Sequence, residues 1–241
     1  MNKADFEQAK AYVAQEEGRV LNALDEYGRT NKYLMNVGAD KGRIVCDLMA
    51  EVKPKAMLGG YVGYSCIGNA VRNAGGMRYY SLEMNPEFAA VIMSLIDLAG
   101  LSDVVEVVAG SGDASLLRLH SVGWLEYIDF MFLDHYKPAS TTDLKLCEEL
   151  KLISPGSVLP VDNVIKPGNP PYLEYVRRTF NEKRGKLGES GRSEGMPGRT
   201  VDQYKKRYGN MKFNQSTGNT NLVYESGLVN SFEPTGVPVS N

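Results

Sequence analysis

The feature that most constrains this chain is an apolar run that ends in four chemically versatile residues. Residues 128–133 read Ile-Asp-Phe-Met-Phe-Leu, and Asp134, His135, Tyr136 and Lys137 follow directly. Such a run suits a strand buried on both faces, as in a parallel sheet. In open α/β sheets, ligands bind beyond the carboxyl ends of the strands. The run therefore predicts that Asp134 and Lys137 lie at a functional rim of the sheet.

A second run of the same form follows along the chain. Residues 156–161 lead into Asp162 and Asn163, so polar oxygens again follow a strand. With Asp134 they make three oxygen donors beside Lys137, which suggests a hard metal ion and a base. Asp and Asn are also ordinary turn and helix-cap residues, so a structural role is the alternative.

Strands and helices alternate along the centre of the chain. We expect strands at 56–58, 77–82, 104–108, 128–133 and 156–161, with helices between them. This alternation predicts an α/β fold whose sheet is mostly parallel, with helices on both faces.

We expect a single domain over residues 1–241, made of four parts. These are N-terminal helices at 1–52, the α/β core at 53–180, a basic mobile insertion at 181–212, and a closing hairpin and tail at 213–241. The insertion is expected to be a loop because it has few apolar residues. The antiparallel hairpin is expected at 222–229.

Composition narrows the class of protein. Apolar residues make up 43% and charged residues 23%, as in soluble globular proteins, and the net charge of −2 favours neither nucleic acid nor membrane as a partner. The three cysteines lack CxxC spacing, and the amino terminus lacks the apolar core of a signal peptide. We therefore expect a soluble, cytoplasmic protein, and we further expect it to be a monomer.

A glycine-rich turn after the first expected strand indicates a nucleotide-type ligand. Gly59, Gly60 and Gly63 allow close approach of the backbone, and Glu83 follows 20 residues beyond Gly63, where an acid commonly binds ribose hydroxyls. The glycines read GGxxG rather than GxGxxG, so no pyrophosphate cradle is evident. This spacing favours S-adenosylmethionine over a dinucleotide, with Ser111 expected near the adenine.

The chain resembles the catechol O-methyltransferases over nearly its whole length outside the basic insertion. Five motifs occur in the family's order: Met35-Asn36-Val37-Gly38, Gly59-x-Tyr61-x-Gly63-Tyr64-Ser65, Glu83-Met84-Asn85-Pro86, Phe132-Leu133-Asp134-His135-Tyr136-Lys137, and Asp162-Asn163-Val164-Ile165-x-Pro167-Gly168. The resemblance implies a Rossmann-like class I methyltransferase with a mostly parallel seven-stranded sheet and a C-terminal antiparallel hairpin.

The resemblance also implies roles for single residues. The metal is Mg²⁺, with Asp134, Asp162 and Asn163 as ligands, and Lys137 is the catalytic base. Residues expected to bind S-adenosylmethionine are Met35, Val37, Gly59, Tyr61, Ser65, Glu83, Met84, Ser111, Asp134 and His135. Residues expected to bind the catechol are Tyr33, Tyr136, Lys137, Asn163, Pro167, Asn219 and Asn221.

The sequence departs from the family's pattern at several positions. Met57 replaces an acid at the end of the first strand, and Tyr33 and Tyr136 replace two tryptophans beside the catechol ring. Gly112 stands where the family has a glutamine that contacts the methyl donor. Residues 219–221 read Asn-Thr-Asn where the family has a glutamate near one catechol hydroxyl.

The expected reaction is Mg²⁺-dependent transfer of a methyl group from S-adenosylmethionine to one hydroxyl of a catechol. One alternative is a metal-dependent O-methyltransferase of the caffeoyl-coenzyme A type, whose phosphorylated carrier the basic insertion would meet. Another is a non-catalytic S-adenosylmethionine-binding protein. A nucleotide-dependent dehydrogenase is disfavoured by the glycine spacing.

Overall fold

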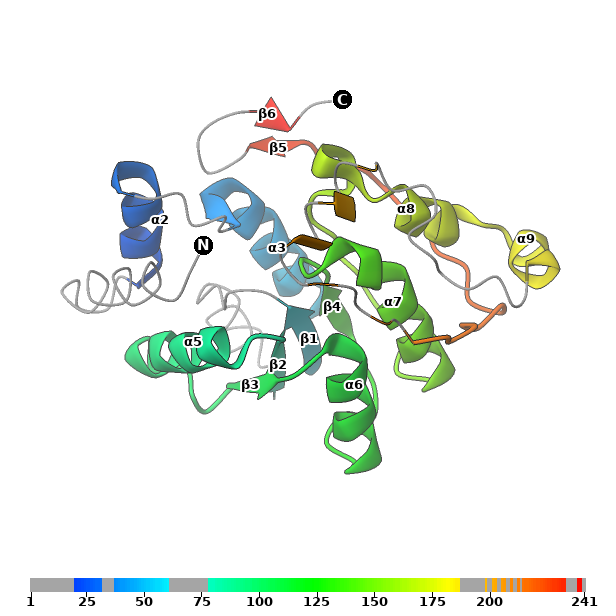
Figure 1. Ribbon diagram of the computed structural model, residues 1–241, viewed down its shortest axis with the longest axis horizontal. Coiled ribbons are helices and arrows are strands. Elements are labelled where there is room, and N and C mark those ends of the chain that lie inside the picture. Colours follow the sequence, from blue (N-terminus) through cyan, green and yellow to red (C-terminus); the bar gives the residue numbers. More distant parts are fainter. Residues whose placement is uncertain are drawn as a thin grey trace.

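The computed structural model describes residues 20–31, 37–60, 78–186, 214–232 and 238–239, with isolated positions between 198 and 212. Figure 1 shows the main sheet at the centre of the molecule with helices around it, and two short strands at the upper edge near the C-terminus. Within the described residues, no helix has both the length and the apolar character needed to cross a bilayer.

The main sheet is parallel throughout its described part. Its strands are β1 (Ala56–Gly60), β2 (Arg78–Glu83), β3 (Val105–Ala109) and β4 (Phe130–Phe132), in the order β3-β2-β1-β4. Because all four strands run in the same direction, their carboxyl ends lie along one edge. The α/β class predicted from the sequence is confirmed.

The predicted fifth strand, 156–161, lies beside β4 but pairs with it only at isolated points. Phe130 bridges to Val158 and Leu133 bridges to Val161, both in parallel. Pro160 lies between the bridging residues and has no N–H to donate to a ladder. The described main sheet therefore has four strands, and the predicted number of seven is corrected.

Helices cover both faces of this sheet. The described helices are α2 (Val20–Thr30), α3 (Gly38–Val52), α5 (Pro86–Leu98), α6 (Gly112–Ser121), α7 (Ser140–Glu149), α8 (Pro170–Arg177) and α9 (Phe180–Gly185), with short turns η1 (Lys137–Ala139) and η2 (Val164–Gly168). The start of α5 follows its sequence signals, because Asn85 caps the N–H groups of Glu87 and Phe88 and Pro86 takes the first helical position.

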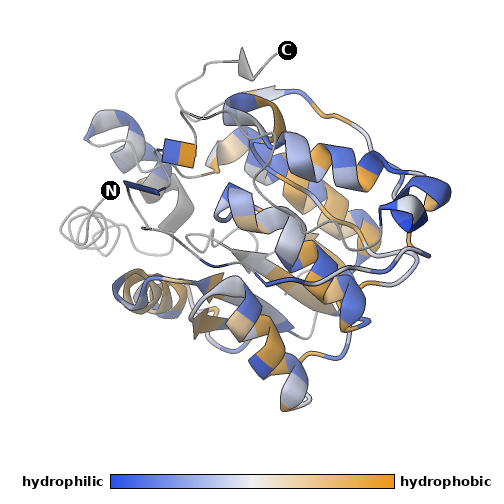
Figure 2. Cartoon of the chain, turned by 45° about the vertical axis from the view of Figure 1, so that its right-hand side comes forward, coloured by the Kyte–Doolittle hydropathy of each residue, from blue (hydrophilic) through white to orange (hydrophobic). Residues whose placement is uncertain are grey.

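Alternate residues of each strand supply two separate apolar clusters. Met57, Tyr79 and Phe130 pack on one face with residues of α3 and α5. Leu58 and Met131 pack on the other face with residues of α6, α7 and α8. Figure 2 shows that the helices carry both hydrophilic and hydrophobic residues, as expected for elements with one buried side.

The C-terminal segment differs from the prediction. Residues 222–229 form no strand, and the antiparallel pair consists of β5 (Ser231–Phe232) and β6 (Pro238–Val239). Leu222 and Tyr224 instead pack against the core beside α7 and α8. Side-chain contacts, rather than a ladder of backbone hydrogen bonds, therefore attach residues 222–229. The predicted C-terminal antiparallel pairing is present, but at 231–232 and 238–239 rather than at 222–229.

The predicted loop at 181–212 begins with a helix. Thr179 and Glu182 form a capping box that starts α9, and Lys183 is only 4% exposed. Residues 181–185 are therefore part of the fold, whereas most of 187–212 lies outside the described residues. The burial of Lys183 could not be predicted from the sequence, because the basic stretch around it has no periodic apolar residues that would indicate a buried helix face.

Glu148 joins these C-terminal elements to α7. Its carboxylate is buried and accepts hydrogen bonds from the Tyr175 and Tyr224 hydroxyls, each at 2.5 Å, and from the Asn219 N–H at 2.7 Å. Lys183 Nζ lies 3.5 Å from Glu148 Oε1 and over both tyrosine rings. Burial lowers the pKa of Lys183, and the Glu148 charge opposes that shift.

Glu148→Ala should lower the free energy of unfolding by about 3–5 kcal/mol, because it leaves a buried ammonium without its counter-charge. Urea unfolding of the two proteins measures the difference. Glu149→Ala, which removes an exposed carboxylate from the next residue, is the control and should change the value by less than about 0.5 kcal/mol. Equal effects of the two substitutions would contradict the proposed contribution of Glu148.

Candidate active site

Asp134 and Lys137 form an ion pair just beyond β4. Lys137 Nζ donates to Asp134 Oδ1 at 2.9 Å, and the two side chains are 5% and 9% exposed. The chain turns after Leu133, and η1 begins at Lys137, which returns its side chain toward the strand end. The sequence predicted that these two residues act together, and the structure brings them into contact.

Asp162 and Asn163 lie at the neighbouring strand end. The Asp162 N–H donates to the carbonyl of Leu133 at 3.1 Å, so the two chain segments are joined where their functional side chains begin. The Asn163 N–H donates to Asp162 Oδ1 at 2.7 Å, and Asn163 has a left-handed backbone with φ of 59°. Asparagine tolerates this conformation better than most residues.

Lys41 joins this cluster from helix α3, and sequence reasoning missed it. Its ammonium lies 3.0 Å from Asp162 Oδ1, and its side chain is 9% exposed. Lys41 precedes the buried residues Val45 and Met49 by one and two helical turns. The position of Lys41 on the apolar side of the helix was therefore the sequence signal that could have indicated its burial.

Electrostatics shows that the two strand ends act as one cluster. Burial raises the pKa of Asp134, the Lys137 charge opposes that rise, the Asp162 carboxylate adds to it, and Lys41 opposes it more weakly. Asp134 and Asp162 are thus close enough to repel each other, and each is compensated by a lysine.

The cluster offers hard oxygen donors. Within the described residues no group of three His, Cys, Asp or Glu side chains is arranged to hold a metal ion. The donor set that the sequence predicts has two carboxylates and one amide, and the structure places its members at two joined strand ends. Oxygen donors of these kinds suit Mg²⁺ rather than a soft metal.

A cavity opens beside this cluster at the ends of β1 and β2. Its lining includes Gly59, Glu83, Met84, His135 and Tyr136. Glu83 is 8% exposed, and its Oε1 accepts the N–H of Asn85 at 2.8 Å. At Gly59 a Cβ atom would collide with the hydroxyl of Tyr79, so any larger residue there would force this buried ring to move.

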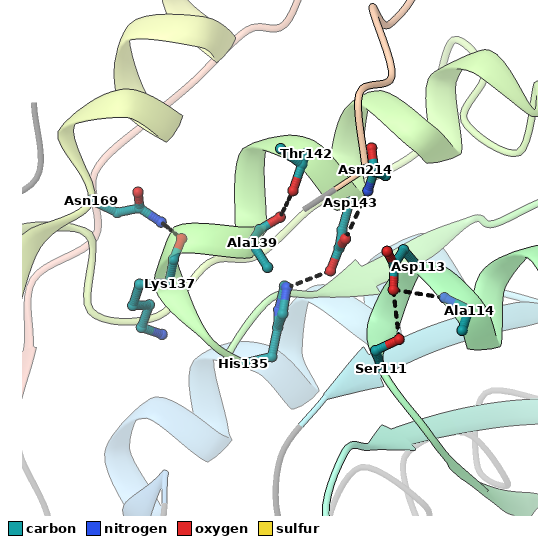
Figure 3. A network of polar contacts seen from close by, with 10 residues as sticks. All are labelled: Ser111, Asp113, Ala114, His135, Lys137, Ala139, Thr142, Asp143, Asn169 and Asn214. Carbon is teal, nitrogen blue, oxygen red and sulfur yellow. Dashed lines mark hydrogen bonds and ion pairs between the residues drawn. The ribbon is translucent and has the colours of Figure 1, made fainter. Parts of the chain in front are cut away.

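Asp143 of α7 orients His135 in this cavity. His135 Nε2 lies 3.1 Å from Asp143 Oδ2, and Asn214 Nδ2 donates to Asp143 Oδ1 at 3.4 Å. Figure 3 shows His135 and Asn214 approaching the carboxylate from separate segments. Asp143 lines the cavity but was not predicted, because one acid in the first turn of a helix is an ordinary sequence feature.

The absence of a side chain at Gly112 makes room for the Asp143 carboxylate. A Cβ atom at Gly112 would lie 2.5 Å from Asp143 Oδ2, so the glycine leaves the space that the carboxylate takes. The neighbouring Ser111 donates its hydroxyl to Asp113 Oδ1 at 2.6 Å, also at the start of α6. Glycine at 112 and the acid at 143 are therefore sterically linked.

The remaining predicted site residues differ in burial and in the contacts that they make. Val37 is buried in the cluster with α3 and α5, and Pro167 is exposed in η2. Asn219 is in a turn, where its N–H binds Glu148 and its Oδ1 accepts the N–H of Asn221 at 3.0 Å. Their roles at a ligand stay predictions. Four further residues, Tyr33, Met35, Tyr61 and Ser65, lie outside the described residues.

Comparisons with known proteins point to one family. Residues 11–177 match the O-methyltransferase family. The chain is 38% identical over 167 residues to catechol O-methyltransferase from Bos taurus, and 39% identical over 166 residues to catechol O-methyltransferase B from Danio rerio. Each alignment covers 68% of this chain, but only 61% and 63% of the respective relative.

A solved structure has the same fold. The O-methyltransferase from Bacillus cereus in complex with SAH gives a TM-score of 0.53 at 21% identity, covering 80% of this chain and 79% of that one. At this identity the likeness concerns the fold alone. It agrees with the α/β class and with helices on both faces of a parallel sheet.

Gly112→Ala should lower the free energy of unfolding by about 1–3 kcal/mol, because the added methyl group displaces the Asp143 carboxylate. Urea unfolding measures the loss, and the imidazole NMR signals of His135 should shift. Gly185→Ala is the control, since no atom lies within 4 Å of the added Cβ. If Gly112→Ala, like the Gly185→Ala control, left stability and the His135 signals unchanged, the steric link between residue 112 and Asp143 would be refuted.

Proposed function

We propose, because the chain belongs to the O-methyltransferase family, that it transfers a methyl group from S-adenosylmethionine to one hydroxyl of a catechol. Its expected relationship to the catechol O-methyltransferases is confirmed by the relatives at 38% and 39% identity. The chain spans about three fifths of their length, so the activity and the substrate are part of the proposal. A cytoplasmic location and a monomeric state stay predictions.

The observation that carries the proposal is the joined pair of strand ends. Asp134 follows β4, Asp162 follows the segment that is bridged in parallel to β4, and Lys137 contacts Asp134 at 2.9 Å. A cavity whose lining includes Glu83 and His135 lies beside them. Acid and base groups thus stand next to a space suited to a nucleoside-type ligand, as a bisubstrate reaction requires.

Asp134, Asp162 and Asn163 would hold Mg²⁺ at this rim. Their oxygen donors fit the ion, and three protein ligands would fill only part of its octahedral coordination shell, which would leave room for both hydroxyls of a catechol. When bound, Mg²⁺ supplies Lewis acidity that favours loss of a phenolic proton.

Lys137 would accept that proton at Nζ. The lysine is buried and adjacent to the proposed ligand Asp134, so its nitrogen is close to where the catechol would bind. A positioned base contributes about 10²–10⁴ in rate. Tyr136, a half-buried residue of the cavity lining, would flank the catechol ring.

Glu83 and His135 would hold the methyl donor. The Glu83 carboxylate lies at the end of β2, where it would accept hydrogen bonds from ribose hydroxyls. His135 is fixed by Asp143 on the cavity wall. Correct alignment of two reactants can account for roughly 7–11 kcal/mol of a barrier, so orientation outweighs proton removal.

The proposal is tested by incubation with isotopically labelled S-adenosylmethionine, Mg²⁺ and a panel of catechols and coenzyme A thioesters, with products identified by mass spectrometry. We expect monomethylated catechols and no reaction with monophenols, which lack the second hydroxyl for the metal. Methylation of coenzyme A esters alone would reject the catechol assignment, and no product from any phenol would reject catalysis.

Lys137→Ala should reduce turnover about 10²–10⁴-fold because the proton acceptor is lost. Binding of S-adenosylmethionine, measured by calorimetry, should change little. Lys55→Ala removes an exposed lysine at the amino end of β1, the opposite edge of the sheet, and should keep full activity. Full turnover by the Lys137 variant would show that the base is assigned wrongly.

Chelation should abolish turnover, and added Mg²⁺ should restore it, because the catechol hydroxyls would lose their anchoring cation. Initial rates in EDTA, followed by a Mg²⁺ titration, measure the dependence. Asp134→Ala should give low rates that Mg²⁺ does not raise. Equal rates with and without chelator would remove the metal from the mechanism.

A further inference from the structure

Lys41 contacts the carboxylate that the proposed function assigns to the metal. Its ammonium lies 3.0 Å from Oδ1 and 3.2 Å from Oδ2 of Asp162, so it faces both oxygens. The two side chains are 9% and 13% exposed, and water therefore screens the pair only weakly. A cation that binds Asp162 must approach an oxygen already facing a positive charge.

The position of Lys41 is set by the fold. It lies in α3 between the buried glycines Gly38 and Gly42, on the side that carries Val45 and Met49 into the core. The helix thus holds the lysine stem in place. Mg²⁺ binds oxygen at about 2.1 Å, and the ammonium nitrogen is 3.2 Å from Oδ2, so an ion on Oδ2 would lie no more than about 5.3 Å from that nitrogen.

The charges of the cluster balance before any metal arrives. Lys41 neutralises Asp162, and Lys137 neutralises Asp134. A divalent cation would leave this buried group with excess positive charge. Lys41 contributes to that excess, because its ammonium faces both oxygens of Asp162 and its charge would oppose the metal.

We propose that Lys41 is the internal counter-ion of the metal site. It holds Asp162 in place while no metal is bound, and it weakens metal binding by competing for the same oxygens. The inference rests on the proposed function, because it takes Asp162 as a metal ligand. Lys41 is a positioning residue that acts through Asp162.

The test compares Lys41→Met with Arg43→Met. Arg43 lies on the same helix but is 65% exposed and pairs with Asp40 and Asp47, so its removal controls for loss of one charge. Calorimetric titration with MgCl₂ alone should show at least about tenfold tighter binding by Lys41→Met than by the unmodified protein, equivalent to about 1.4 kcal/mol. Arg43→Met should stay within about twofold, and Lys41→Arg should match the unmodified protein.

Thermal unfolding supplies a readout apart from affinity. Without metal, Lys41→Met should have a lower Tm than the unmodified protein, because Asp162 loses its counter-charge. Mg²⁺ should raise the Tm of Lys41→Met by more than it raises the Tm of the unmodified protein. If Lys41→Met does not fold, acetylation of the unmodified protein decides. Saturating Mg²⁺ should then increase labelling of Lys41 and leave exposed Lys55 unchanged.

Three results would overturn the inference. Equal Mg²⁺ affinity of Lys41→Met and the unmodified protein would show that the lysine does not compete. Unchanged acetylation of Lys41 in saturating Mg²⁺ would show that Lys41 of the unmodified protein does not compete with the metal. Absence of Mg²⁺ binding by the unmodified protein would reject the metal site itself. This result differs from the first two, which would reject only the role of Lys41.

Discussion

Charge compensation between buried acids and lysines is the interaction on which the rest of this structure depends. Asp134 and Asp162 lie at adjacent strand ends, and burial together with their mutual repulsion raises the pKa of Asp134. Lys137 and Lys41 reach the two carboxylates from different elements, at 2.9 and 3.0 Å. Without these lysines the strand ends would carry two uncompensated charges in a poorly solvated place, which is costly.

The same principle governs helix α7. Asp143 at one end holds His135 in the cavity and accepts a hydrogen bond from Asn214. Glu148 at the other end holds the C-terminal segment through Tyr224 and the backbone of Asn219. One helix therefore holds the C-terminal segment at two points, and one of them, Asp143, lies in the wall of the cavity. Both attachments are polar groups buried with their partners, and such groups specify a single arrangement because unpaired alternatives are expensive.

The sheet explains why the polar clusters occur where they do. Strands buried on both faces run in one direction, so residues that follow them gather at one edge. Extended backbone alone does not make a ladder, however. Pro160 limits the pairing of residues 156–161 to isolated bridges, and residues 222–229 are held by side chains rather than by a partner strand.

The sequence by itself determined the α/β class, the start of α5 at Pro86, and the meeting of Asp134, Lys137, Asp162 and Asn163, because these follow from local apolar runs and their direction. Only the tertiary structure decided that Lys41, Asp143 and Lys183 belong to buried clusters. Each is a charged residue whose partner lies on another element. No local pattern encodes a contact that exists only once helices have packed against the sheet and excluded water from between them.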